Sequence, residues 1–396
     1  MSKQQPNLRA IVEFLVVGIC TFAFSVLLVG VGAALFGPNA ASSRDYIEYW
    51  AAGQQIVHHQ DPYDEDAILQ LERSAGYPAN FTVQVMGNPP SALPLLLPLG
   101  MVCPRTGLLL WELLLVTALI TSIYLIRKMY GRPKSLLHLL GFSFAPTLSC
   151  LLAGQVGILI LLGLVLFLRW HLTRPFLAGA SLWLCLLKPH LFLPFGLVLL
   201  IWIALTRSYK ILAGTAVAIG VSCLVATMIN PAIWTQYQSM MKIERIDRLP
   251  LPSLSPMLRA YVYPHSMWLQ CLPAFLGCVW ALAYFLKRHH EWDWLEDGSI
   301  LMLVSVFVTP YSWFFDQVIL IPAVLHGVYS TRSRTYVAIF ALISAVIEIA
   351  ALRGVKLDSK FYLWTAPAWL VWYVLATRPS RAIHVCELAL EADPAV

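Results

Sequence analysis

The chain has 396 residues, of which 59% are hydrophobic and only 12% are charged, and its formal net charge is +6. Soluble globular proteins carry about 25% charged residues. This composition therefore excludes a soluble enzyme, a disordered chain and a nucleic-acid-binding module. It predicts an all-α polytopic membrane protein, with most of the chain in lipid.

Apolar runs that can form membrane helices recur along the whole chain. A span needs about 20 mostly apolar residues. The longer candidates are 10–36, 107–126, 135–152, 191–206, 210–229, 267–286, 313–329, 335–351 and 361–377. The shorter runs 156–169, 175–188 and 299–309 are expected to span with their polar ends at the interface. We therefore expect about twelve transmembrane helices.

The segment 89–103 decides the orientation of the chain. It is apolar but contains four prolines, so it makes a poor straight helix. If it only dips into the outer leaflet, the later basic loops all fall on the cytoplasmic side, which Lys and Arg favour. The prediction is one membrane domain, 1–378, with outer loops at about 38–106 and 230–266. Both termini are then cytoplasmic, and 379–396 is a short tail.

The first outer loop begins with a predicted short helix that carries acidic residues. Ser42 or Ser43 is expected to cap this helix. Asp45, Glu48 and Tyr49 share one of its faces through their i, i+3 and i+4 spacing. Partial burial at the membrane surface raises the pKa of a carboxyl towards the range of a general base. Ordinary solvated charges at a helix start are the simpler interpretation, and the residues alone leave both open.

The rest of the outer segments carries further polar candidates. Asp61 and Tyr63 flank a proline, a pattern typical of a solvated turn. Lys188 stands in a short outer turn against the local charge bias, so it either binds a phosphate or extends to the interface. Arg245, in the second outer loop, has the planar fork that suits phosphate oxygens, although plain surface charge is the alternative.

The run Thr309–Trp313 precedes a further acidic residue inside an apolar segment. Asp316 is costly to bury in lipid, so we expect it to face a cavity or a partner. Trp313 is either a site residue or part of the interfacial aromatic belt. The eight cysteines form no CxxC pair and have no histidine at metal-binding spacing, so neither a disulfide nor a metal site is expected.

Together, these motifs resemble those of the membrane glycosyltransferase 87 family. The matching elements, in order, are RDYIEYWAAG, DPYD, NPPSALPLLLPLG followed by LLLW, Gly154–Gln155, Lys188–Pro189, Leu258–Arg259 and TPYSW. They extend over about residues 40–325. The family consists of polyprenyl-phosphate-sugar-dependent transferases of the GT-C superfamily and includes α-mannosyltransferases. The resemblance thus implies a GT-C-type fold whose first outer loop carries juxtamembrane helices.

The resemblance also implies roles for individual residues. Asp45 matches the acidic residue that acts as catalytic base, while Lys188 and Arg259 match positions of cations that hold the donor phosphate, to which Arg245 is added. The remaining candidate substrate-binding residues are Glu48, Tyr49, Asp61, Tyr63, Asn88, Gln155, His190, Trp313 and Asp316. Many members have His-His where this chain has Phe315–Asp316, so a role carried by those histidines does not transfer.

The expected reaction is transfer of a hexose from a polyprenyl-phosphate sugar to an acceptor hydroxyl, with inversion and without a metal or cofactor. Mannose is the family default, and glucose and arabinose are alternatives. The partners are membrane lipid, the donor and a glycan or glycolipid acceptor, with no nucleic acid. The site is expected on the periplasmic or extracellular face of the inner or plasma membrane. The rival functions are a lipid or glycolipid transporter or flippase, which usually shows inverted repeats, and a non-catalytic membrane scaffold.

Overall fold

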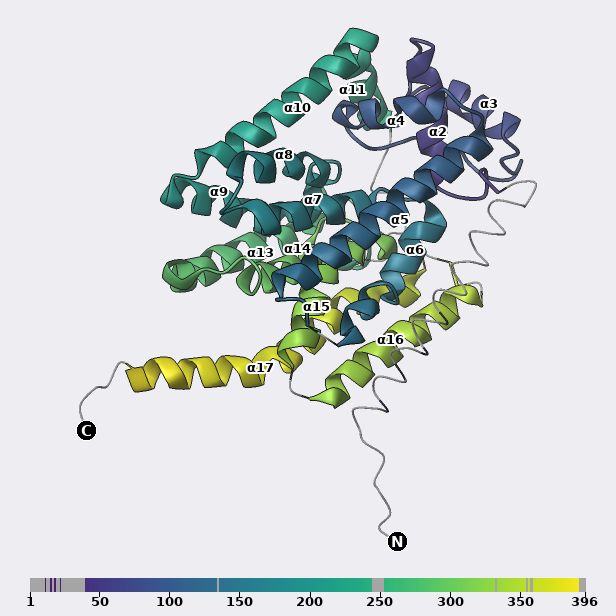
Figure 1. Ribbon diagram of the computed structural model, residues 1–396. Helices are drawn as coiled ribbons and strands as arrows, with labels where there is room; N and C mark the ends of the chain where they lie inside the picture. The colour runs from purple at the N-terminus through teal and green to yellow at the C-terminus, as the bar shows by residue number, and fades with distance from the viewer. Residues whose placement is uncertain are drawn as a thin grey trace.

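The computed structural model of the protein describes residues 40–391, apart from 134, 244–252, 332, 354 and 357–358, together with the single positions 11, 15, 18 and 22. Within these residues the regular secondary structure is helical and no strand occurs (Figure 1). The predicted all-α class is confirmed.

The helices follow one another closely along the chain. The α-helices are α2 (Tyr46–Val57), α3 (Glu65–Ser74), α4 (Leu93–Gly100), α5 (Pro104–Met129), α6 (Ala145–Ala153), α7 (Gly157–Trp170), α8 (Pro175–Cys185), α9 (Leu193–Thr206), α10 (Tyr209–Ile229), α11 (Ile233–Ile243), α12 (Leu254–Val262), α13 (Met267–Arg288), α14 (Asp297–Val308), α15 (Ile321–Ser330), α16 (Arg334–Leu352) and α17 (Thr365–Glu391). The 3₁₀-helices are η1 (Pro90–Ala92), η2 (Leu136–Gly141), η3 (Pro189–Phe192), η5 (His289–Glu291), η6 (Phe314–Leu320) and η7 (Lys360–Trp364).

Several of these helices have the length and composition of membrane spans. Five described stretches are both long and apolar enough to cross a bilayer: Pro104–Met129, Pro189–Thr206, Tyr209–Ile229, Met267–Glu291 and Arg334–Ala351. Shorter apolar helices include Gly157–Trp170, Pro175–Cys185, Asp297–Val308 and Phe314–Ser330. These helices fit a membrane protein. The count of twelve spans and the side of the membrane on which each loop lies stay predictions.

Two boundaries differ from the sequence-based expectation. The predicted span 135–152 is divided into η2 and α6, and Pro146 lies in the first turn of α6. Proline lacks a backbone N–H and is tolerated mainly at a helix start, so it favours a new helix there over a continuous one. At the other end of the chain, α17 continues past residue 378 to Glu391, so the segment predicted as a tail is helical over most of its length.

The helix α4 occupies the proline-rich segment 89–103. It has 8 residues, with Pro98 inside it. At about 1.5 Å per residue such a helix is about 12 Å long, whereas the hydrocarbon core of a bilayer is about 30 Å thick. The helix is therefore too short to cross a membrane alone, which supports the interpretation that this segment does not span.

The helices α2, α3 and α4 gather at one corner of the molecule, and α16 and α17 lie at the opposite end (Figure 1). Between these ends lies the hydrophobic core, in which α7 is largely enclosed: Leu161, Leu164 and Val165 have no exposed surface. The turn before α7 lies next to the start of α2. The end of α8 and the start of η6 also lie next to this turn. These turns build the site described below.

A glycine-to-glycine contact sets the crossing of α2 and α4. A Cβ atom added at Gly100 would lie 2.0 Å from the carbonyl oxygen of Gly53, and one added at Gly53 would lie 2.6 Å from the carbonyl oxygen of Leu96. Both clashes involve backbone, which cannot rotate away as a side chain can. The close approach of α2 to α4 thus requires glycine at both positions.

We expect Gly100→Ala to lower the midpoint of thermal unfolding in detergent, because overpacking typically costs about 1–3 kcal/mol. The matched control is Gly196→Ala in α9, where an added Cβ meets nothing within 4 Å. There the better helix propensity of alanine should leave stability unchanged or raise it slightly. Equal midpoints for the two variants would contradict the proposed role of the α2–α4 crossing.

Candidate active site

The short helix predicted at the beginning of the first outer loop is α2, and its acidic face lies at the start of this helix. Asp45 is the N-cap residue of this helix, but its side chain makes no capping hydrogen bond. The expected cap from Ser42 or Ser43 is therefore wrong. The Asp45 carboxylate instead accepts a hydrogen bond of 3.0 Å from Nε2 of Gln155. A contact to another segment thus replaces the usual bond to the helix amides.

The turn between α6 and α7 carries Gln155 to this helix. Gly154 ends α6 in the left-handed conformation, with φ of 72°, which glycine adopts without strain. A Cβ atom at this position would also lie 2.8 Å from Cβ of Tyr46. The indole N–H of Trp111 on α5 donates to the Gly154 carbonyl at 2.6 Å. The turn is thereby fixed between α2 and α5, and the side chain that follows reaches Asp45.

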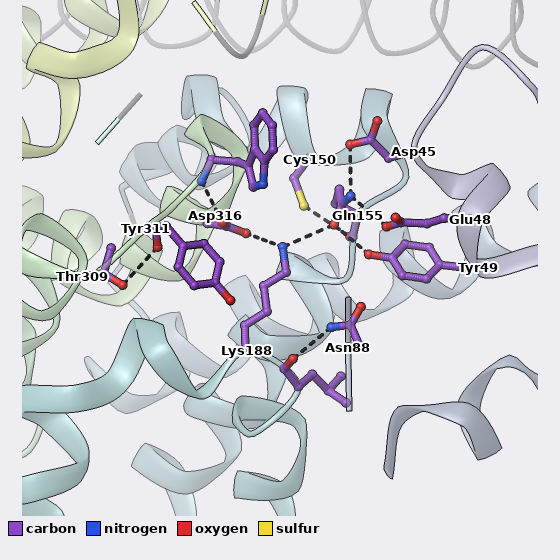
Figure 2. Close-up of polar contacts among 12 residues, drawn as sticks. Asp45, Glu48, Tyr49, Asn88, Cys150, Gln155, Lys188, Thr309, Tyr311 and Asp316 are labelled. Atoms are coloured by element: carbon purple, nitrogen blue, oxygen red, sulfur yellow. Dashed lines mark hydrogen bonds and ion pairs between the residues drawn. The ribbon is translucent and has the colours of Figure 1, made fainter. Parts of the chain in front are cut away.

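Gln155 is the centre of a cluster of hydrogen bonds (Figure 2). Its Nε2 donates to Asp45 and, at 3.3 Å, to Oε1 of Glu48. Its Oε1 accepts from the hydroxyl of Tyr49 at 2.7 Å and from Nζ of Lys188 at 3.3 Å. The predicted shared face of Asp45, Glu48 and Tyr49 is therefore confirmed, because all three side chains contact the same amide.

A buried ion pair completes the cluster. Nζ of Lys188 lies 2.7 Å from Oδ1 of Asp316, and the two side chains are 13% and 1% exposed. The second carboxylate oxygen of Asp316 accepts a hydrogen bond from the backbone N–H of Trp313 at 2.9 Å, which caps η6. The expectation that Asp316 faces a partner is confirmed. Trp313 enters this contact through its backbone, and its indole packs against Phe315.

The environment of Asp45 changes its acidity. Burial raises the pKa of this carboxyl, and the hydrogen bond from Gln155 and the charge of Lys188 oppose that rise, whereas Asp316 adds to it. A buried carboxyl whose pKa is raised by its surroundings and that lies near a lysine is the kind of group that accepts a proton during a reaction.

Three further predicted residues line the backbone on either side of Lys188. Nδ2 of Asn88 donates to the carbonyl of Leu187 at 2.9 Å, and the hydroxyl of Tyr63 donates to the carbonyl of Asn88 at 3.3 Å. On the other side, the ring of His190 stacks on Tyr311 with centroids 3.8 Å apart. The carbonyl of His190 accepts a hydrogen bond from Thr309. These residues hold the turn that carries Lys188.

Three other predicted residues do not join the cluster through a described contact. Asp61 accepts a hydrogen bond of 2.9 Å from the N–H of Tyr63, so it stabilises its own turn. Arg259 is 5% exposed on α12 and its Nη1 lies 3.3 Å from Sδ of Met267. Arg245 lies in 244–252, outside the described residues. Of the three predicted phosphate-binding cations, Lys188 is the one whose described contacts join the cluster, and phosphate binding by any of them stays a prediction.

Sequence reasoning missed an ion pair that anchors the start of α2. Nη1 of Arg44 lies 2.9 Å from Oε1 of Glu112 on α5, and the two side chains are 9% and 7% exposed. Glu112 is the only charged residue in the apolar run 107–126, and an isolated charge in such a run usually marks a buried partner. That signal was present in the sequence. Phe315 was also missed; Nζ of Lys188 lies 5.2 Å from the centre of its ring.

The Lys188–Asp316 pair should be energetically coupled. Removing one partner of a buried ion pair typically costs about 3–5 kcal/mol, because the other charge is left uncompensated. We expect Lys188→Met and Asp316→Asn each to lower the free energy of unfolding. The double variant should be more stable than the sum of the two losses predicts, with a coupling energy of about 1 kcal/mol or more.

Denaturant titration in detergent measures this coupling. A control cycle pairs Lys188→Met with Asp297→Asn, a buried acid whose ion-pair partner is Arg288. Effects in that cycle should be additive. Additive effects in the Lys188–Asp316 cycle as well would show that the pair does not stabilise the fold.

Comparison with known protein families gives one match. The family model of glycosyltransferase family 87 matches residues 87–310, more than half of the chain. The match includes Gln155 and Lys188, whereas Asp45 precedes it and Asp316 follows it. No curated protein and no solved structure significantly matches the chain. The motifs, the apolar helices and this match together show that the chain belongs to glycosyltransferase family 87.

Proposed function

We propose that the protein transfers a hexose, most simply mannose, from a polyprenyl-phosphate sugar to an acceptor hydroxyl at the outer face of the inner or plasma membrane. The observation that carries this proposal is that one side chain, Gln155, contacts both Asp45 and Lys188. A candidate base and a candidate phosphate-binding cation thus lie on either side of one amide. The donor lies in the membrane lipid, and the acceptor is a glycan or glycolipid.

In the proposed reaction Asp45 takes the proton of the acceptor hydroxyl while the acceptor oxygen attacks the anomeric carbon. The bond between that carbon and the phosphate oxygen breaks, and the lipid phosphate leaves with the bonding electrons. Lys188 stabilises the negative charge that develops on the leaving phosphate. A single displacement of this kind inverts the configuration at the anomeric carbon, and the positive charge comes from the protein rather than from a metal.

The charges of the cluster favour a donor of low charge. Asp316 contacts Lys188, and Asp45 and Glu48 contact the same Gln155 amide as Lys188 does, so the cluster holds three carboxylates and one lysine. A sugar esterified to a lipid monophosphate carries one negative charge, whereas a nucleotide diphosphate sugar carries two. Since like charges nearby disfavour an added anion, the monophosphate donor suits this site better. Arg259 and Arg245 remain proposed contacts to the donor from the second outer loop.

Reconstitution in liposomes tests the donor class. We expect purified protein to form product from at least one polyprenyl-phosphate hexose in the presence of a membrane lipid extract, and none from nucleotide sugars. The panel should contain mannose, glucose and arabinose donors. Movement of the labelled lipid between leaflets without any product would support the transporter function instead.

Substitution of the two carboxylates identifies the base. We expect Asp45→Asn to bind donor and to lose transfer by about 10²–10⁴-fold, which is what a well-placed base contributes. Glu48→Gln should retain more activity, because Asp45 is the residue that matches the base of the family. The control is Asp64→Asn, since Asp64 only caps α3, by accepting from the N–H groups of Asp66 and Ala67.

The comparison of these variants in the liposome assay is decisive for Asp45. If Asp45→Asn stays within a few-fold of wild type, Asp45 is not the base. If only Glu48→Gln loses transfer, the role belongs to Glu48.

A further inference from the structure

The amide of Gln155 has no hydrogen-bonding capacity left for a substrate. A glutamine side chain offers two N–H donors and one carbonyl oxygen with two lone pairs. In this cluster both donors go to carboxylates, those of Asp45 and Glu48, and the oxygen accepts from Tyr49 and Lys188. The residue is only 6% exposed. All four positions are thus filled by groups of the protein itself.

We infer that Gln155 is a positioning residue, which orients Asp45 and favours its ionised form, and that it does not contact the substrate. This inference rests on the proposed function of Asp45 as the base. It changes the expectation from the sequence, which assigned Gln155 to substrate binding.

The orientation of the amide is fixed by charge. A rotation that exchanged the oxygen and nitrogen would direct the carbonyl oxygen at two carboxylates and the NH₂ group at the ammonium of Lys188. Both contacts would then be repulsive. The backbone of Gln155 is fixed as well, because its N–H donates to the carbonyl of Cys150 at 3.1 Å and its carbonyl accepts from the Cys150 thiol. The amide therefore presents its N–H groups to Asp45 and Glu48 in one defined direction.

The protonation of Asp45 depends on several groups around it. Charged or titratable groups of the described elements that face the cluster are Glu48 and Tyr49 on α2, Tyr77 after α3, Cys150 on α6, Lys188 before η3, His190 on η3, Asp316 on η6, and the Arg44–Glu112 pair beside it. Gln155 donates a hydrogen bond to the charged form of Asp45, and this bond opposes the rise of the Asp45 pKa that burial causes.

Loss of the Gln155 donor should change the pH dependence of sugar transfer. A general base must be ionised, so transfer is present above its pKa and is lost as the pH falls through that value. Without the donor of Gln155 the charged form is less favoured and the pKa of Asp45 rises further. The acid limb of the pH–rate profile should therefore move to higher pH.

The test uses Gln155→Met, which keeps the length of the side chain but makes none of the four hydrogen bonds, and Gln155→Glu, which provides no N–H for Asp45. We expect kcat at neutral pH to fall about tenfold or more, the acid-limb midpoint to move to higher pH, and the KM for the polyprenyl-phosphate sugar to change little. The control is Gln317→Met. Gln317 is a buried glutamine whose amide contacts Thr365 and Trp369, apart from the cluster.

The midpoint does not depend on the amount of folded enzyme, so a merely structural effect would leave it unchanged, as we expect for Gln317→Met. An unmoved midpoint in both Gln155 variants would overturn the inference. So would a KM for the donor raised tenfold or more at unchanged kcat, because Gln155 would then contact the substrate.

A second measurement needs no turnover. Infrared titration of the carboxyl C=O band, taken as the difference between each protein and its Asp45→Asn form, gives the midpoint of Asp45 itself. That midpoint should be higher in Gln155→Met than in wild type, and an equal value overturns the inference. If wild type shows this titration but transfers no sugar, the proposed function fails while the positioning role of Gln155 stands.

Discussion

A lysine ammonium held away from water requires a counter-charge, and this requirement organises the site. Lys188 meets it with Asp316, which is 128 residues away in the sequence and 2.7 Å away in space. The pair joins the turn after α8 to the start of η6. Gln155 then links this pair to α2, because its oxygen faces the cation and its nitrogen faces the carboxylates. The turns that carry Gln155 and Lys188, the turn at the start of η6 and the helix α2 are thereby held together. The polar groups that join them would be costly to bury without partners.

The surrounding packing makes that arrangement geometrically possible. The turn that carries Gln155 lies so close to α2 that Gly154 can hold no side chain, and the same is true where α2 crosses α4 at Gly53 and Gly100. The Arg44–Glu112 ion pair fixes the residue before Asp45 to α5. Asp45 is thus positioned from both of its neighbours along the chain, by Arg44 on one side and by Tyr46 on the other. A base must be held in this way if it is to meet an acceptor hydroxyl in a productive geometry.

The residue at position 316 sets the charge next to Lys188. The resemblance described above implies a histidine here in many members, whereas Asp316 places a carboxylate next to Lys188. A neutral imidazole would leave the lysine charge available to a phosphate, whereas a carboxylate balances it. The donor phosphate must therefore share Lys188 with Asp316 in the proposed mechanism.

The sequence alone determined the features that depend on local order. Apolar runs and prolines indicated the helical class and a proline-containing segment too poor for a straight span, and the spacing of Asp45, Glu48 and Tyr49 placed them on one face of a helix. The order of the motifs identified the family. The tertiary structure decided which of these residues meet. Periodicity does not encode contacts between distant segments, so the pairing of Lys188 with Asp316, the four bonds of Gln155 and the replacement of the α2 cap by a contact to Gln155 could not be read from spacing. Those contacts depend on how closely the helices approach, and that approach is set by the glycines and buried charges of the folded chain.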